Sequence, residues 1–166
     1  AYLRALFWRR LPMTALNTVN IIMLLLLAVT LVSGILISLY ALPIVRLRGL
    51  ASIYVHAVHL SAGVLLFHVV GVHVGLHARM LWRALLRRIP LRIPQTMSRI
   101  LYVVGILLTA AGIHRFITTR IYDKILFEHL SFGGLAGTWA YQCDLLLMFL
   151  ACACLAIFYQ SWRMRK

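Results

Sequence analysis

Five of the seven histidines of this chain lie in one apolar segment between Ile53 and Ala78. They are His56, His59, His68, His73 and His77. Imidazole is costly to place inside a bilayer, so histidines in a membrane-spanning segment indicate a functional site. In a helix, His59 and His73, which are fourteen residues apart, share a face to within about 40° and lie about 21 Å apart along the axis. His77 follows one turn later, and this spacing suits two haems, one near each membrane surface.

The segment HLSAG, from His59 to Gly63, is partly repeated as HLSFG, from His129 to Gly133. Each copy follows an apolar segment with a small-Gly-Ile step, which suggests a duplicated pair of helices. The two histidines would then face each other near the outer surface, with the glycines one turn away. Imidazoles on both sides, and glycines where side chains would strike a macrocycle, form a haem site. The alternative for the glycines is close packing of helices. His114 lies near the same depth and is a reserve ligand.

A second candidate level, toward the other surface, contains His73 and His77. The equivalent positions in the repeat are Cys143 and Leu147, so no histidine of the chain faces this pair. Three options stay open: this level holds no haem, another subunit supplies the second ligand, or one of the two histidines hydrogen-bonds a quinone head group. Asp144 is the only carboxylate well inside an apolar segment and needs a partner there. Pairing with His73 or His77, or proton movement at a quinone site, is expected of it.

The remaining polar side chains near these levels have simpler explanations. His68 points about 180° away from His59, so it cannot share that site and is expected to bond a neighbouring backbone carbonyl. His56 is expected to form a hydrogen bond near the outer surface. Asp123 and Glu128 are expected to be solvated there.

Other catalytic patterns are absent from the sequence. There is no Gly-rich phosphate loop, no CxxC pair, no CxxCH attachment site and no HExxH. The chain therefore has no recognisable pattern for a nucleotide cofactor. Its three cysteines are expected to pack as small hydrophobic side chains.

The composition indicates a single membrane domain, because 63% of the 166 residues are hydrophobic and 12% are charged. Four segments approach or exceed the roughly 20 apolar residues that a membrane-spanning helix needs. They are residues 15–42, 53–78, 100–118 and 130–158. The start of the fourth is open: a helix from His129 would be unusually long, whereas a span from Trp139 to Tyr159 would leave His129 in a surface loop. We expect an all-α, integral membrane four-helix bundle over residues 1–166.

The net charge of +14 is distributed as the positive-inside rule predicts. Twelve basic residues lie at the two ends of the chain or between the second and third spans, and five lie on the opposite side. Both termini are therefore expected in the cytoplasm, in a multi-pass protein of the inner membrane. Anionic membrane lipid, and not nucleic acid, is the expected partner of these charges.

The stretch VHAVHLSAGVLLFHVVGVHVGLHARML of the second span carries a resemblance, supported by SGILIS in the first span and EHLSFGG near the fourth. The chain resembles the small four-helix b-type cytochromes that anchor bacterial respiratory oxidoreductases, including those of formate dehydrogenases and hydrogenases. The resemblance implies one haem b or two, with the iron held by His59 and His129 at the outer level and by His73 or His77 at the inner one. It also implies electron transfer between a partner oxidoreductase and the quinone pool.

In that interpretation the chain is an electron-transfer subunit that works with other subunits of a redox complex and is not catalytic alone. The competing interpretation is a non-redox structural or anchoring membrane subunit, whose histidines donate interhelical hydrogen bonds. It predicts no visible absorption. A metal-ion carrier ranks third, because only His73 and His77 have the i, i+4 spacing that such a site prefers.

Overall fold

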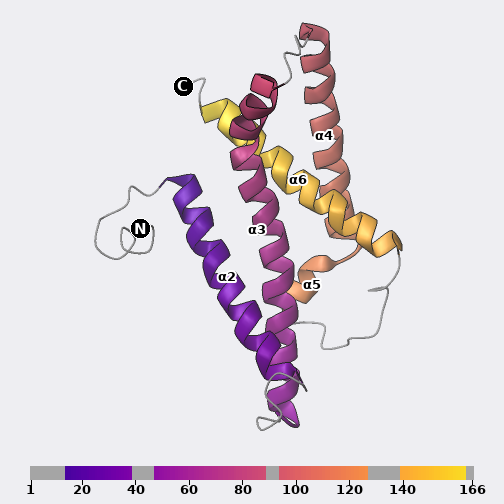
Figure 1. Ribbon diagram of the computed structural model, residues 1–166. Helices are drawn as coiled ribbons and strands as arrows, with labels where there is room; N and C mark the ends of the chain where they lie inside the picture. The colour runs from indigo at the N-terminus through magenta and orange to yellow at the C-terminus, as the bar shows by residue number, and fades with distance from the viewer. Residues whose placement is uncertain (1–13, 39–46, 89–93, 127–138, 164–166) are drawn as a thin grey trace, which may run out of the picture.

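Helices make up the protein over the residues that the computed structural model describes, 14–38, 47–88, 94–126 and 139–163 (Figure 1). The four long helices are α2 (Ala15–Ile37), α3 (Leu50–Arg88), α4 (Gln95–Thr118) and α6 (Trp139–Arg163). A short helix, α5 (Ile121–Ile125), follows α4. No strand occurs in these ranges, and the all-α prediction is confirmed for them.

All four long helices are long and apolar enough to cross a membrane, as the sequence predicts. Their ends differ from the predicted ones. α2 ends at Ile37, and the last residues of the predicted first span lie partly among residues 39–46, outside the described ranges. α6 begins at Trp139, the later of the two predicted starts, whereas residues 130–138 of the longer alternative are not among those described.

The largest difference in length is in α3, which has 39 residues instead of the predicted 26 from 53 to 78. At 1.5 Å per residue it is about 58 Å long, nearly twice the thickness of the hydrocarbon core. Its last ten residues, 79–88, include four arginines. Arginine is a good helix former, so α3 continues beyond the apolar stretch that hydropathy detects.

The long helices form a row and do not close into a bundle. α3 contacts α2 on one side and α6 on the other, and α6 contacts α4 (Figure 1). Among the described residues, α2 contacts neither α6 nor α4. The expectation of a four-helix bundle is therefore wrong for this part of the chain, and α2 leaves a groove open beside α3 and α6.

Glycines set the close approach of neighbouring helices in this row. An added Cβ at Gly71 would lie 2.8 Å from the carbonyl oxygen of Phe149, and one at Gly75 would overlap the backbone of Ala153. At Gly112 an added Cβ would overlap Ala151. The four-residue spacing of the two glycines on α3 is the small-residue pattern that lets membrane helices pack backbone to backbone.

α5 fills the space between α3, α4 and the start of α6. Ile121 packs there against Val64 and Met148 in a small buried cluster. A residue in the left-handed conformation, Arg120, turns the chain between α4 and α5. Asp123 on α5 is fully buried and pairs with Arg120 at 2.9 Å. The expectation that Asp123 is solvated is therefore wrong, because the turn folds it beneath α3.

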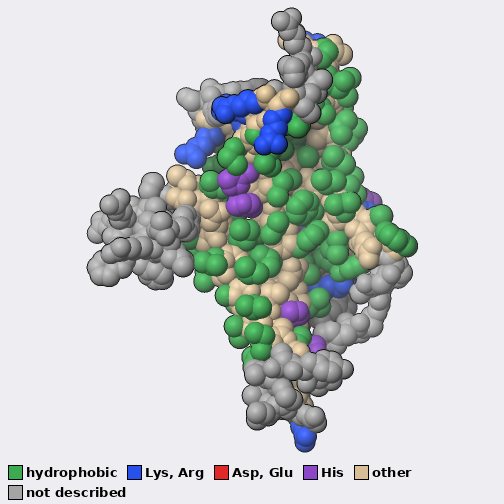
Figure 2. Space-filling view, viewed as in Figure 1, with side chains coloured by type: hydrophobic (Ala, Val, Ile, Leu, Met, Phe, Trp, Pro, Cys, Tyr) green, Lys and Arg blue, Asp and Glu red, His purple; other side chains and the backbone are tan. Residues whose placement is uncertain are grey.

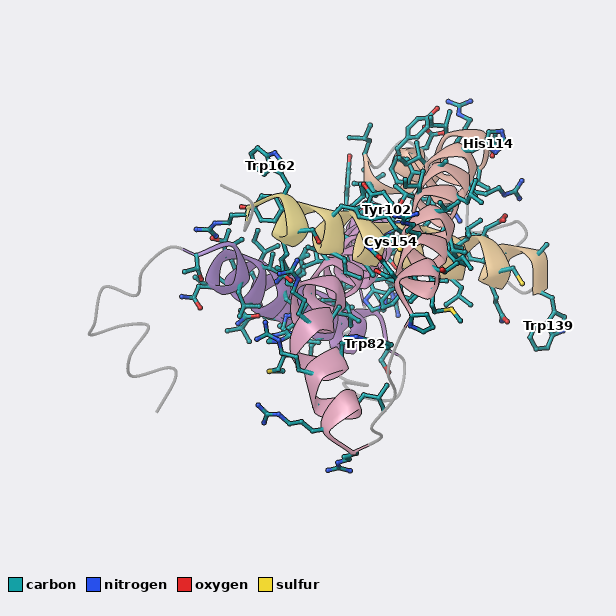
Figure 3. The ribbon with its side chains drawn as sticks, turned by 90° about the horizontal axis from the view of Figure 1, so that it is seen from above. Trp82, Tyr102, His114, Trp139, Cys154 and Trp162 are labelled. Carbon is teal, nitrogen blue, oxygen red and sulfur yellow. The ribbon has the colours of Figure 1, made fainter. Side chains whose placement is uncertain are left out.

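The outer surface is that of a membrane protein. Hydrophobic side chains cover most of the face in Figure 2, and Lys and Arg gather toward its two ends. Trp139 and Trp162 project outward at opposite ends of α6 (Figure 3). They are 23 residues apart, about 35 Å along the axis, and tryptophan is enriched at both membrane–water interfaces. The two tryptophans therefore mark the two ends of a helix that is long and apolar enough to cross a bilayer.

Candidate functional site

His59 is held by a helix other than its own. Its Nδ1 lies 3.0 Å from the carbonyl oxygen of Thr30 and 3.1 Å from the hydroxyl of Ser33, both on α2. A carbonyl oxygen only accepts, so Nδ1 carries a proton, and no hydrogen bond to Nε2 occurs within the described residues. The ring lies over Gly34, where an added Cβ would be 3.1 Å from the Cε1 of His59. Any larger residue at position 34 would push the ring away.

This arrangement is the one that orients a metal-binding imidazole. Histidine ligands donate their second ring N–H to a carbonyl, a carboxylate or water, which fixes both the tautomer and the ring plane. The hydroxyl of Ser33 also donates to the carbonyl oxygen of Val29, at 2.6 Å, so the group beside His59 is itself fixed. His59 therefore fits the role of an axial haem ligand through Nε2.

Gly63 follows His59 by one turn and is not used for helix packing. An added Cβ at Gly63 would meet nothing within 4 Å in the described part of the protein. Gly34 and Gly112, by contrast, lie against His59 and α6 respectively. The packing alternative therefore explains those two glycines, whereas Gly63 has the open space that the haem hypothesis requires of it.

The predicted partner of His59 is outside the described residues. His129 and Gly133 both lie within 127–138, so the predicted pair and the repeat on which it rests stay predictions. The reserve ligand, His114, is exposed on α4, which lies next to α6 in the row, with its backbone not packed on that of α3. Figure 3 shows it at the edge of the molecule. The structure does not bring His114 to His59.

At the inner level, the rings of His73 and His77 lie 4.6 Å apart, centroid to centroid. The Nδ1 atom of His73 is buried and has no hydrogen-bond partner in the described part. α2 and α3 are antiparallel, and His59 of α3 lies beside Gly34 of α2. His73 follows His59 by fourteen residues, and Asn20 precedes Gly34 by fourteen. His73 and Asn20 are therefore at the same level of the two helices. The Oδ1 atom of Asn20 is likewise buried without a partner. This level is thus a polar position between α2 and α3 whose groups are unsatisfied.

Asp144 does not belong to this level. Its carboxylate accepts two hydrogen bonds from Arg115 of α4, from Nε at 2.6 Å and from Nη2 at 2.5 Å. The expected pairing with His73 or His77 is therefore wrong. The bidentate ion pair links α4 to α6 at the end of the row opposite to the α3 arginines, and it explains how a carboxylate persists in an apolar helix.

The other two histidines of α3, His56 and His68, bond to their own helix. Nδ1 of His68 donates to the carbonyl oxygen of Val64 at 2.7 Å, and Nδ1 of His56 donates to that of Ser52 at 2.9 Å. His68 lies edge-on to Phe116 of α4, and its Nε2 is buried without a partner in the described part. The prediction for His68 is confirmed, whereas for His56 the hydrogen bond is present and its depth in the membrane stays a prediction.

Sequence reasoning missed a cavity of about 430 Å³ between α3, α4 and α6. Aromatic side chains from all three helices line it, together with two serines, Ser98 and Ser161, and with Arg79, which also lines the neighbouring cavity at the end of α3. The aromatic residues are Trp82, Tyr102 and Phe158 (Figure 3). An aromatic lining with a few hydroxyls is typical of a site for a flat, partly polar ring. No sequence motif predicts this cavity, because its lining residues are scattered over three helices.

No cluster of three or more metal-binding side chains occurs among the residues that the structure describes. No known protein family matches the chain, and neither a curated protein nor a solved structure shows a significant match. The resemblance to b-type cytochromes therefore depends on the quoted segments alone, and the structural support for a haem site is the hydrogen-bonded ring of His59.

Proposed function

We propose that this chain is a b-type haem-binding membrane subunit that transfers electrons between a partner oxidoreductase and the quinone pool. The observation that carries the proposal is the fixed ring of His59, with Nδ1 bonded to Thr30 and Ser33 and Nε2 left for a ligand. The open space beside Gly63 supports it. A haem iron supplies one-electron chemistry when bound. The chain's own residues orient the ligand, exclude water with apolar helices and hold the group at a fixed depth.

The second ligand of this outer site is proposed to be His129, and the inner level is proposed to use His73 or His77. Their unsatisfied surroundings support a role for the inner pair, because a buried polar group in a bilayer is costly without a partner. A second haem with a ligand from another subunit, or a quinone head group, would satisfy them. The aromatic cavity beside Trp82 and Tyr102 is a further position that suits a quinone ring.

The proposed location is the inner membrane, with both termini and the arginine-rich end of α3 in the cytoplasm. The start of α2, the end of α3, the start of α4 and the end of α6 lie at the same end of the row (Figure 1). Twelve of the seventeen basic residues belong to these ends or to the segments next to them. That imbalance supports the orientation.

The deciding experiment is a visible spectrum of the purified, folded protein, oxidised and then reduced with dithionite, followed by pyridine haemochrome analysis. The proposal expects a low-spin b-type spectrum. The His59→Leu variant should lose the spectrum of the outer centre, whereas His56→Leu should keep it. His56 is a matched control, since it lies one turn away on the same helix and donates its Nδ1 proton to the carbonyl oxygen of Ser52 on that helix. A colourless, folded wild-type protein would refute haem binding.

The second candidate is a non-redox anchoring subunit, and one observation favours it. The hydrogen bonds from His59 to Thr30 and Ser33 join α2 to α3, which is what a purely structural histidine would do. This candidate expects no visible absorption, and it expects His59→Leu to weaken the association of α2 with α3. A haem spectrum that persists in His59→Leu, together with lowered stability, would favour this role for His59.

A further inference from the structure

Three arginines of α3, one turn apart, face a cavity at the end of the helix row. Arg79, Arg83 and Arg87 line this cavity of about 610 Å³ together with Arg163 of α6 and Thr14 at the start of α2. Like charges four residues apart on a helix repel each other. An anion in the cavity would therefore stabilise this end of α3.

The protein itself supplies no such anion in the part that the structure describes. The whole chain has three acidic residues. Two of them, Asp123 and Asp144, pair with arginines near the other end of the row. Arg83, Arg87 and Arg163 contact no carboxylate within the described ranges. Their counter-charge therefore comes from outside these ranges, and the membrane is its nearest source.

The charged cavity continues into an apolar one. A second cavity, of about 300 Å³, shares three lining residues with the first: Ala15, Leu76 and Tyr159. It extends between α2, α3 and α6 along Val19, Val72 and Leu155, and no charged residue lines it. The groove exists because α2 contacts α3 but not α6. The two cavities together have a cationic end and a hydrocarbon end, which is the shape of an amphiphile.

The depth of the site suits a lipid. Trp162 and Tyr159, near the end of α6, are 57% and 44% exposed, as interfacial aromatic residues are. The arginines lie at the same end, where Figure 2 shows Lys and Arg gathered. They are thus at the level of lipid phosphates, and the apolar groove runs toward the membrane centre.

We propose that this site binds one anionic glycerophospholipid, with its phosphate among the arginines and an acyl chain in the groove between α2 and α6. A head group with hydroxyls, as in phosphatidylglycerol, fits one further feature. Gln160 lines the charged cavity, and its buried Oε1 atom has no hydrogen-bond partner in the described residues. We expect a hydroxyl of the head group to donate to this side chain.

The test uses the full chain in mild detergent and native mass spectrometry. Phosphatidylglycerol is titrated against phosphatidylcholine with the same acyl chains, and inorganic phosphate is titrated separately. Two variants probe the two ends of the site: Arg83→Gln with Arg87→Gln for the head, and Val19→Trp for the groove. Arg99→Gln is the matched control, because Arg99 lies on α4 at the same end of the row and lines neither cavity.

Wild type should bind phosphatidylglycerol at least tenfold more tightly than phosphatidylcholine. The double variant should lose about fivefold per arginine, whereas Arg99→Gln should be unchanged. Val19→Trp should weaken binding of the long-chain lipid and leave phosphate unaffected. Equal affinity for the two lipids in wild type would overturn the proposal without reference to any variant. Binding of phosphate as tight as that of phosphatidylglycerol, with no effect of Val19→Trp, would also overturn it in favour of a free-anion site.

Discussion

The close approach of Gly75 on α3 to α6 gives a quantitative prediction. An alanine Cβ at position 75 would overlap the carbonyl group of Ala153 and the Cβ of Ala156. Neither atom can rotate away, so α3 and α6 must separate. Inserting a methyl group into a packed interface costs about 1–3 kcal/mol, and alanine recovers about 1 kcal/mol of helix propensity relative to glycine. The free energy of unfolding of Gly75→Ala should therefore fall by up to about 2 kcal/mol.

With both variants measured in haem-free protein, Gly63→Ala is the matched control, because its Cβ would meet nothing within 4 Å in the described part of the protein. It has the same propensity gain and no packing cost, so it should be neutral or stabilising by up to about 1 kcal/mol. The propensity gain cancels in the difference between the two variants, which should be about 1–3 kcal/mol. Equilibrium unfolding in mixed detergent micelles measures both. Equal stability of the two variants would refute the proposed close packing of α3 on α6.

Three further predictions follow from other contacts. Asp144→Ala should destabilise the protein by leaving the guanidinium of Arg115 unpaired, and exchange of the two residues should restore part of the loss, measured by the same unfolding assay. His68→Phe should keep both the stability and any haem spectrum. The new ring lies beside Phe116, and a buried nitrogen without a partner in the described part is removed. Loss of the spectrum would instead identify His68 as a ligand. A cysteine placed at Arg88 should be labelled from the cytoplasm and one at Arg48 from the periplasm, after replacement of the native cysteines, and the opposite pattern would reverse the proposed orientation.

The sequence predicted features that depend on one helix at a time. Four apolar stretches long enough to span a bilayer are visible in composition alone, and α2, α3, α4 and α6 correspond to them. The bond of His68 to the carbonyl oxygen of Val64, four residues earlier, follows from helical spacing. These predictions succeeded because a helix's own geometry fixes them, whatever its neighbours do.

Features that depend on the register between helices were not predictable in this way. Asp144 pairs with Arg115 because α4 and α6 place them at the same level, and nothing in either segment specifies that level. Asp123 is buried because Arg120 adopts a left-handed conformation, which no residue preference there signals. The row arrangement likewise follows from which helix faces contain glycine. Gly71 and Gly75 are visible in the sequence as a small-residue pair, but their partner helix is not.

The hydrogen bonds of the α3 histidines distinguish His59 from His56 and His68. His56 and His68 each donate a hydrogen bond from Nδ1 to a carbonyl oxygen four residues earlier in α3. His59 bonds to α2, so its ring is fixed relative to two helices at once. A structural histidine gains little from that precision, since a serine or threonine can also join helices by a hydrogen bond. A ligand gains much, because its ring plane and tautomer set the position of the bound iron. The two-helix attachment of His59, with open space beside Gly63, therefore favours ligation over simple packing as the reason for an imidazole at this position.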